Sequence, residues 1–250
     1  MKEEIISHIE QLEEKEGIRI LLAVESGSRA WGFPSPDSDY DVRIIYIRPH
    51  DWYLAIENKK DSIEYFHGEL LDISGWDIQK ALRLAGKSNA TLFEWNQSPI
   101  LYKEEQNFRS DFAACYKAYF QPRHALNHYK GIAKNAWSSL EGSREIKLKR
   151  LFYVIRPLLA AKWVLLNDEV PPMNIEPLLD LVEEADTRTK IIQLIQLKSA
   201  QTEAYTHRLE PWIEAYIERE NAFIENHPDI PFRALPDFSQ LNTYFKRLLV

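Results

Sequence analysis

The chain has little cysteine and no long uninterrupted apolar run. One cysteine, Cys115, occurs in 250 residues, so no disulfide can form within the chain, and Cys115 has no CxxC partner for a metal. This composition favours a reducing compartment, and we expect a cytoplasmic location. The most apolar stretch, around residues 151–166, is interrupted by Arg156, Pro157 and Lys162. We therefore expect no membrane span.

An excess of positive charge is also missing. The formal net charge is −7, which argues against a protein that coats nucleic acid. It does not exclude a local basic groove. The first eleven residues, MKEEIISHIEQ, are charged and lack the apolar core of a signal peptide. The hydrophobic content of 45% is that of a globular protein with a real core. The length corresponds to one large domain or two small ones.

The pattern that points to chemistry lies in residues 25–43, ESGSRAWGFPSPDSDYDVR. Gly27 and Ser28 form a small turn of the kind that can hold a phosphate. Ten residues further on, Asp39 and Asp41 lie in a predicted strand over residues 39–47. Alternate residues of a strand share a face, so both carboxylates point the same way. Together they can hold one or two divalent cations, and phosphate beside Mg²⁺ indicates nucleotide chemistry.

Familiar alternatives fit this segment poorly. Asp37, Asp39 and Asp41 match the first ligands of an EF-hand, but Val42 and Arg48 stand where that loop needs Gly and Glu. GSRAWG has neither the glycine spacing of a Rossmann fingerprint nor the Gly-Lys-Ser/Thr of a Walker A loop.

Zinc is not expected from the histidine spacing. His124 and His128 lie four residues apart on a possible helix, but no third ligand stands out in the sequence.

The Gly-Ser turn, the spacer and the Asp-x-Asp on a strand resemble the signature of the DNA-polymerase-β-like nucleotidyltransferase superfamily. GSRAWG...PDSDYDVR is most similar to a bacterial nucleotidyltransferase family linked to RNA repair, whose members mostly have unknown substrates. LDISGWDIQKALRLAGKSNATLFEWNQSPILY, residues 71–102, fits the same family. YVIRPLLAAKW, residues 153–163, followed by Pro171-Pro172, is a weaker match. These blocks cover most of residues 20–175.

The resemblance implies an α/β (α+β) nucleotidyltransferase domain with a mixed sheet, which we place at residues 1–104, followed by an all-helical domain at residues 105–250. Local patterns agree with this division, because strand signals become few after Tyr102. A helix is expected to start near Trp76, with Ser74 and Asp77 as a capping box. The expected elements are a helix over 2–15, strands over 18–24, 39–47, 62–66 and 69–74, and a long helix over 144–166 kinked at Pro157.

The activity that the resemblance implies is the transfer of an NMP from an NTP to an acceptor. Asp39 and Asp41 would hold two Mg²⁺ ions, with Mn²⁺ as the other candidate. Gly27 and Ser28 would grip the triphosphate of the incoming nucleotide. Arg29 is a candidate phosphate contact and is equally plausible as an exposed arginine.

A third carboxylate on a neighbouring strand is usual in the superfamily, and Asp72 is our choice. It lies between Leu71 and Ile73, and a charge in such a strand is costly to bury unless it is paired or binds a metal. Its expected role is general base toward the acceptor, metal ligand, or both. Glu64 and Glu69 are the alternatives.

A second set of candidate residues lies on the long helix. Lys149, Tyr153 and Arg156 share a face at i, i+4 and i+7. This face could hold phosphates and stack a base on Tyr153, and in two-domain members of the superfamily the helical domain closes over the nucleotide. A surface stripe with Tyr153 as packing is an equal alternative.

The sequence does not distinguish three candidate acceptors: an RNA end, a protein hydroxyl and a small molecule. A different class of function is a non-catalytic nucleotide-binding or toxin-antitoxin-like regulatory module of the same fold.

Overall fold

The computed structural model describes residues 1–68, 70–140 and 142–250. They form two compact units, each built from separate stretches of chain. The first, here the sheet unit, contains Met1–Ala30, Asp39–Phe120 and Ala234–Val250. The second, here the helical unit, contains Trp31–Ser38 and Gln121–Arg233. The domain boundary near residue 104 stays a prediction.

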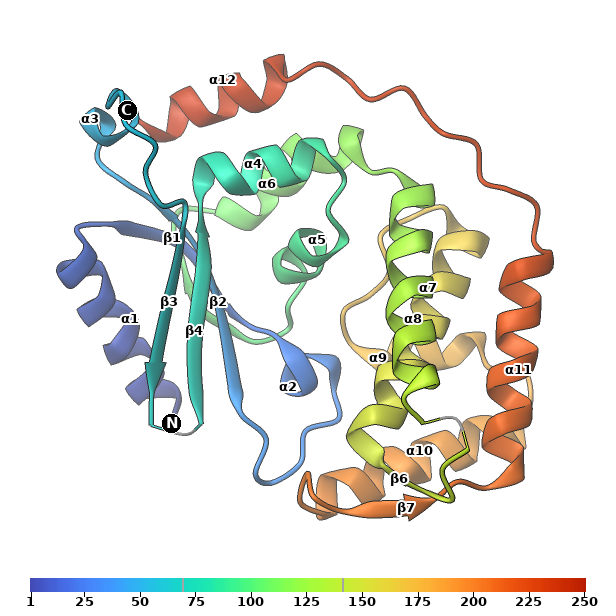
Figure 1. Cartoon of the computed structure of the whole chain (residues 1–250). Helices are drawn as coiled ribbons and strands as arrows, with labels where there is room; N and C mark the ends of the chain where they lie inside the picture. Colours follow the sequence, from blue (N-terminus) through green and yellow to red (C-terminus); the bar gives the residue numbers. More distant parts are fainter. Residues whose placement is uncertain (69, 141) are drawn as a thin grey trace. The chain divides into compact units, whose positions relative to one another are not determined.

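A five-stranded mixed sheet forms the centre of the sheet unit (Figure 1). Its strand order is β3-β4-β2-β1-β5, with β2 and β4 parallel and all other neighbours antiparallel. The predicted mixed α/β architecture is therefore confirmed. The strands are β1 (Arg19–Glu25), β2 (Tyr40–Ile47), β3 (Ser62–His67), β4 (Leu71–Asp77) and β5 (Leu101–Glu104).

One face of the sheet is covered by α1 (Lys2–Glu16) (Figure 1). Ile5, Ile9 and Leu12 recur at helical spacing and pack in one buried cluster with Val42 and Ile44 of β2 and other strand residues. The side of β2 opposite the carboxylates thus packs on a helix, as its alternation predicts. The helix ends at a glycine in the left-handed conformation, Gly17 at φ 60°.

Helices also cover the other face of the sheet (Figure 1). Because both faces of β1 are covered, this strand is apolar almost throughout. The predicted capping box at the start of α4 is wrong: Ser74 lies within β4, and Asp77 alone caps the helix by accepting from the backbone N–H of Gln79. The remaining helices of this unit are α2 (Gly27–Trp31, ending in the helical unit), α3 (His50–Tyr53), α4 (Ile78–Gly86), α5 (Ala90–Asn96), α6 (Phe108–Tyr116), η1 (Lys117–Tyr119) and α12 (Ser239–Leu248).

The helical unit is organised around α8 (Leu148–Asn167), which contacts α7, α9, α10 and α11. Most of α8 is buried, and the helix runs through Pro157 without ending there. It begins later than predicted because residues 145–147 form a short strand. The other elements are α7 (Pro122–Ser138), β6 (Glu145–Lys147), α9 (Ile175–Leu178), η2 (Leu179–Leu181), α10 (Ala185–Ala200), β7 (Thr206–Arg208) and α11 (Pro211–Asn226), with β6 and β7 paired in an antiparallel ribbon.

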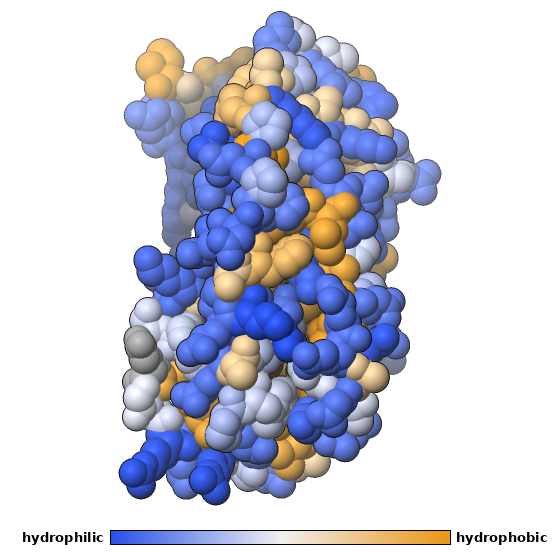
Figure 2. Space-filling model, turned by 90° about the vertical axis from the view of Figure 1, so that its right-hand side faces the viewer, coloured by the Kyte–Doolittle hydropathy of each residue, from blue (hydrophilic) through white to orange (hydrophobic). Residues whose placement is uncertain are grey.

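Hydrophilic residues cover most of the face drawn in Figure 2, with smaller hydrophobic patches between them.

Among the described residues, no helix combines the length and apolar character needed to cross a membrane.

The pairing of β2 with β4 leaves no room for a side chain at Gly75. A Cβ there would lie 2.3 Å from the backbone oxygen of Ile44 and 2.2 Å from its Cγ1. We expect Gly75→Ala to lower the free energy of unfolding by about 1–3 kcal/mol, the usual cost of overpacking. Gly131→Ala is the control, since a Cβ at Gly131 in α7 meets no atom within 4 Å, and alanine should raise helix stability by about 0.5–1 kcal/mol. Urea denaturation tests both, and equal stability of Gly75→Ala and wild type would contradict the close pairing.

Candidate functional site

Two of the three predicted carboxylates meet where β2 and β4 begin. The parallel register pairs Asp41 with Asp72, and directly paired residues of neighbouring strands share a face of the sheet. Asp72 therefore lies beside Asp41, and its role as the third carboxylate stays a prediction. Glu64 of β3 pairs with Ser74, further along β4. Glu69, the other alternative, lies outside the described residues.

Arg43 bridges the two carboxylates. Its Nη2 lies 2.9 Å from Oδ1 of Asp41, and its Nη1 lies 2.9 Å from Oδ2 of Asp72. All three side chains are largely shielded from solvent, with 18% of Arg43, 32% of Asp41 and 28% of Asp72 exposed. Arg43 was not among the residues predicted from the sequence. The signal was available, because Arg43 follows Asp41 by two residues and so shares its strand face.

One oxygen of Asp72 is buried without a partner. Among the residues that the structure describes, Oδ1 of Asp72 has no hydrogen-bond partner, and leaving a carboxylate oxygen desolvated and unpaired is unfavourable. A hard divalent cation prefers carboxylate oxygen. The donor set of Asp41 and Asp72 therefore fits Mg²⁺ or Mn²⁺.

Gly27 is required by the side chain of Asp41. A Cβ on Gly27 would lie 2.1 Å from Oδ2 of Asp41, and Gly27 has a φ of +60°. The backbone N–H of the preceding residue, Ser26, donates to the carbonyl of Asp41 at 2.8 Å. The Gly-Ser turn and Asp41 thus lie in contact, and Ser28 is buried in the first turn of α2.

Asp39 and Arg29 lie beside this contact. Asp39 is exposed and directly precedes β2. Its backbone carbonyl accepts a 3.0 Å hydrogen bond from Nε of Arg29. The guanidinium of Arg29 also lies 3.8 Å from the ring centroid of Tyr40. Arg29 is therefore held in place by the start of β2.

The buried carboxylate of Glu25, which was not predicted from the sequence, fixes the backbone of Asp41. Oε1 of Glu25 accepts from the backbone N–H of Asp41 at 2.8 Å, and Oε2 accepts from the hydroxyl of Tyr102. Burial raises the pKa of Glu25 above its usual 4.5, while the bonds from Tyr102 and Asp41 act in the opposite direction. The sequence signal was an acidic residue that ends the apolar run of β1.

The helical unit contains a separate pocket of about 750 Å³. Lys149 and Tyr153 line it, together with residues from α7, the ribbon strand β6 and the segment before β7. Arg156 is not among the lining residues. It is buried, with Nε donating to the carbonyl of Met173 at 3.0 Å and the guanidinium 4.8 Å from the ring centroid of Trp31. The pocket is lined by Ile132, Asn135, Ala136, Ser139, Lys147, Lys149, Arg150, Tyr153, Glu203 and Ala204.

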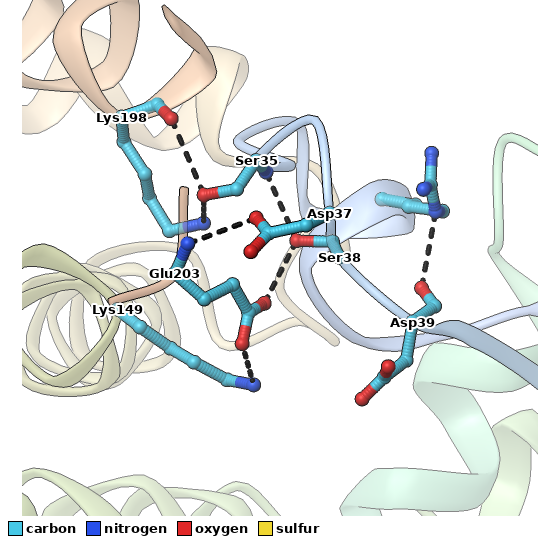
Figure 3. Close-up of polar contacts among 8 residues, drawn as sticks. Ser35, Asp37, Ser38, Asp39, Lys149, Lys198 and Glu203 are labelled. Atoms are coloured by element: carbon cyan, nitrogen blue, oxygen red, sulfur yellow. Dashed lines mark hydrogen bonds and ion pairs between the residues drawn. The ribbon is translucent and has the colours of Figure 1, made fainter. Parts of the chain in front are cut away.

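Glu203 makes polar contacts with several residues at this pocket (Figure 3). Its Oε2 lies 2.6 Å from Nζ of Lys149, and its Oε1 accepts from the hydroxyl of Ser38 at 2.8 Å. Burial alone would raise the pKa of Glu203, but these two bonds and the nearby lysines outweigh it and lower the pKa. The backbone N–H of Glu203 donates to Asp37 at 2.9 Å.

A buried lysine, Lys198, also holds the segment of residues 35–38 in place. Nζ of Lys198 donates to Oγ of Ser35 at 3.1 Å, and the backbone N–H of Ser35 donates to Oγ of Ser38 at 2.9 Å (Figure 3). Lys198 is 2% exposed, and burial lowers its pKa. Residues 35–38, which lead into Asp39, are therefore held by the segment around residues 198–203.

The buried carboxyl of Glu25 should give stability a recognisable pH dependence. Because its pKa is raised in the folded state, the folded protein binds more protons than the unfolded chain at pH values above 4.5. This contribution to stability is full below 4.5 and is lost as the pH rises through the folded pKa. Glu25→Gln should therefore remove a fall in unfolding free energy with rising pH, measured by urea denaturation between about pH 4 and 7.

Glu57→Gln is the control for this experiment. The pKa of the exposed Glu57 is lowered by its own backbone N–H and by Lys59, so its contribution has the opposite sign and is lost as the pH falls. An unchanged slope in Glu25→Gln would contradict the burial of an ionisable group at this position.

A family model and a Bacillus relative agree with the resemblance seen in the sequence. The model of the family described as "RlaP: RNA repair pathway DNA polymerase beta family" matches residues 1–247. The uncharacterised protein YcgL of Bacillus subtilis (strain 168) is 41% identical over 225 residues, covering 88% of this chain and 86% of its own. A crystal structure of a nucleotidyltransferase-like protein from Exiguobacterium sibiricum 255-15 is 11% identical, with a TM-score of 0.32, over 88% of this chain and 74% of that one. From the family match and the Bacillus relative, the chain belongs to the RlaP family, the RNA repair pathway DNA polymerase beta family.

Proposed function

We propose that this protein transfers an NMP from an NTP to a hydroxyl or phosphate acceptor and releases pyrophosphate. The observation that carries the proposal is the pairing of Asp41 with Asp72, bridged by Arg43, with one buried oxygen of Asp72 left without a partner in the described structure. Membership of the family supports a nucleotidyltransferase type of function. A non-catalytic nucleotide-binding module of the same fold is the alternative, and the transfer assay below decides between them.

In this reaction the acceptor oxygen forms a bond to the α-phosphorus of the NTP. The bond from the α-phosphorus to the oxygen that bridges to the β-phosphate breaks, and that oxygen leaves with pyrophosphate. For a hydroxyl acceptor, the proton goes to a carboxylate, for which we propose Asp72. Phosphoryl-type transfer depends mainly on positioning and charge neutralisation, so the fixed arrangement of the site is its main contribution.

Asp39, Asp41 and Asp72 are the proposed ligands of Mg²⁺ or Mn²⁺. When bound, such ions would neutralise phosphate charge and favour ionisation of the attacking group. Arg43 holds one oxygen of Asp41 and one of Asp72, and so keeps the two carboxylates adjacent. Glu25 fixes the backbone of Asp41 through its N–H.

The triphosphate is proposed to bind at the turn of Gly27 and Ser28. The turn lies against Asp41, so a phosphate there would be beside the carboxylates. Arg29, held by the carbonyl of Asp39 and the ring of Tyr40, would add a positive charge for the phosphates.

An RNA end is the acceptor that we favour over a protein hydroxyl or a small molecule. The pocket of the helical unit offers cations in Lys147, Lys149 and Arg150, an aromatic ring in Tyr153 and an amide in Asn135. Cations with an aromatic platform suit the phosphates and bases of a single strand. Among the described residues that line the pocket, Glu203 is the single carboxylate, and it already pairs with Lys149. This lining suits a Mg²⁺-bound triphosphate less well, because Mg²⁺ prefers carboxylate ligands. We place the reaction in the cytoplasm on the evidence of the single cysteine.

Transfer should depend on the paired carboxylates. We expect Asp41→Asn or Asp72→Asn to lower NMP transfer at least about 100-fold, because each removes charge worth several kcal/mol at the reacting phosphate. The assay uses each α-³²P-labelled NTP in turn with Mg²⁺, and total RNA or cell extract as acceptor.

Asp51→Asn, at a fully exposed aspartate of α3, is the matched control and should transfer as wild type does. Equal transfer by Asp41→Asn and wild type would sink the proposal. NTP binding by wild type with no transfer to RNA, protein or small molecules would favour the non-catalytic module.

RNA binding should depend on the pocket cations more than on overall charge. Lys147→Glu/Arg150→Glu should weaken binding of a fluorescent single-stranded RNA of about ten nucleotides at least roughly tenfold and reduce its salt dependence. Fluorescence anisotropy measures both effects, without NTP.

The matched control is Lys60→Glu/Lys134→Glu, which makes the same change of net charge at exposed lysines outside the pocket. Equal weakening by the two double variants would show that general charge, rather than the pocket, governs RNA binding.

A further inference from the structure

A group of metal-ligating side chains lies on the sheet unit, away from the carboxylate pair. Glu4 and His8 lie one turn apart on α1, and His67 ends β3. One ligand atom from each residue lies within 4.8 Å of the other two. Local spacing in the sequence could not show this group, because its members come from distant elements.

The packing of α1 explains why the three residues meet. Ile63 of β3 belongs to the buried cluster under α1, and Tyr65 packs against that cluster. His67 follows at the same strand period and so shares their face. The rings of His8 and His67 lie with their centroids 4.1 Å apart, tilted by 40°.

Tyr65 gives His8 an orienting partner. Its hydroxyl lies 3.2 Å from Nδ1 of His8. Metal-bound histidines almost always donate their second ring N–H to an acceptor oxygen, usually of a carboxylate, a backbone carbonyl or water, which fixes the ring and raises its basicity. The hydroxyl oxygen of Tyr65 can take this part for His8. A bond from Nδ1–H of His8 to this hydroxyl leaves Nε2 as the ligand atom.

This group is separate from the proposed catalytic site. Asp72 pairs with Phe66 across β3 and β4, and His67, the next residue along β3, points to the opposite face of the sheet. The donor chemistry also differs, because two imidazoles and one carboxylate suit zinc and its neighbours, whereas Mg²⁺ prefers oxygen ligands alone.

We propose that Glu4, His8 and His67 bind one divalent transition-metal ion, with Zn²⁺ as the representative. Three protein ligands leave a fourth position for water. Ligands about 2.0–2.2 Å from zinc lie closer together than 4.8 Å, and the exposed side chains of Glu4 and His67 can close this distance by rotation. A bound ion would link α1 to the β3 edge of the sheet.

The test uses the full chain, freed of metal with EDTA and dialysed. ZnCl₂ is titrated by calorimetry, and CoCl₂ by visible absorption, which reports nitrogen and oxygen ligation directly. We expect one ion per chain in excess of any that the carboxylates of the candidate catalytic site take up, and a rise in the melting temperature with zinc concentration. His8→Ala/His67→Ala should weaken binding at least about tenfold and abolish the zinc-dependent rise, and Tyr65→Phe should weaken binding roughly tenfold.

His50→Ala/His124→Ala removes two exposed histidines elsewhere and should bind as wild type does. The melting temperature of each variant without metal checks that it folds. Asp41→Asn should also bind zinc at this site as wild type does, so failure of the nucleotidyltransferase proposal would leave this one standing. Absence of saturable binding by wild type, or equal binding by His8→Ala/His67→Ala, would overturn the inference.

Discussion

The parallel pairing of β2 with β4 is the constraint on which the candidate site depends. It places Asp41 opposite Asp72, and two carboxylates side by side on neighbouring strands repel each other. Arg43 offsets this repulsion with one N–H group to each, and its planar guanidinium has the fork geometry for that task. The ion pairs use Oδ1 of Asp41 and Oδ2 of Asp72, so the opposite oxygen of each carboxylate is not engaged by Arg43. The arrangement thus combines a fixed geometry with donor atoms suited to a cation.

The backbone of Asp41 is held as tightly as its side chain. Its N–H donates to Glu25 and its carbonyl accepts from Ser26, while Gly27 leaves the space that its carboxylate occupies. A buried carboxylate such as Glu25 is unfavourable unless its oxygens are hydrogen-bonded, and Tyr102 supplies the second bond. The sequence alone does not reveal why position 27 of the Gly-Ser turn needs a glycine. It is required by close approach of a side chain as well as by its backbone conformation.

Sequence pattern was sufficient where the physical signal is local. Alternation along β2 separated the carboxylate face from the packed face, and an aspartate between apolar residues marked Asp72. The pairing register depends on contacts between distant strands, so Asp72 could be proposed but not set opposite Asp41. β5 is four half-buried residues at the sheet edge and carries little periodicity. The helical unit includes residues 31–38 because Ser35 and Ser38 bond to Lys198 and Glu203, contacts that no local pattern encodes.

Separation of donor types across the sheet has a chemical consequence. Zinc binds most nitrogen and oxygen sites more strongly than magnesium does, so an all-carboxylate site is exposed to competition from zinc. An imidazole-containing site at Glu4, His8 and His67 prefers zinc more strongly than carboxylates do, because imidazole suits the softer ion. The strand period places His67 and the partner of Asp72, Phe66, on opposite faces. If both proposed sites bind metal, each donor set would therefore select its own ion without sharing a ligand, and the carboxylate site would keep the hard cation that the proposed phosphate chemistry requires.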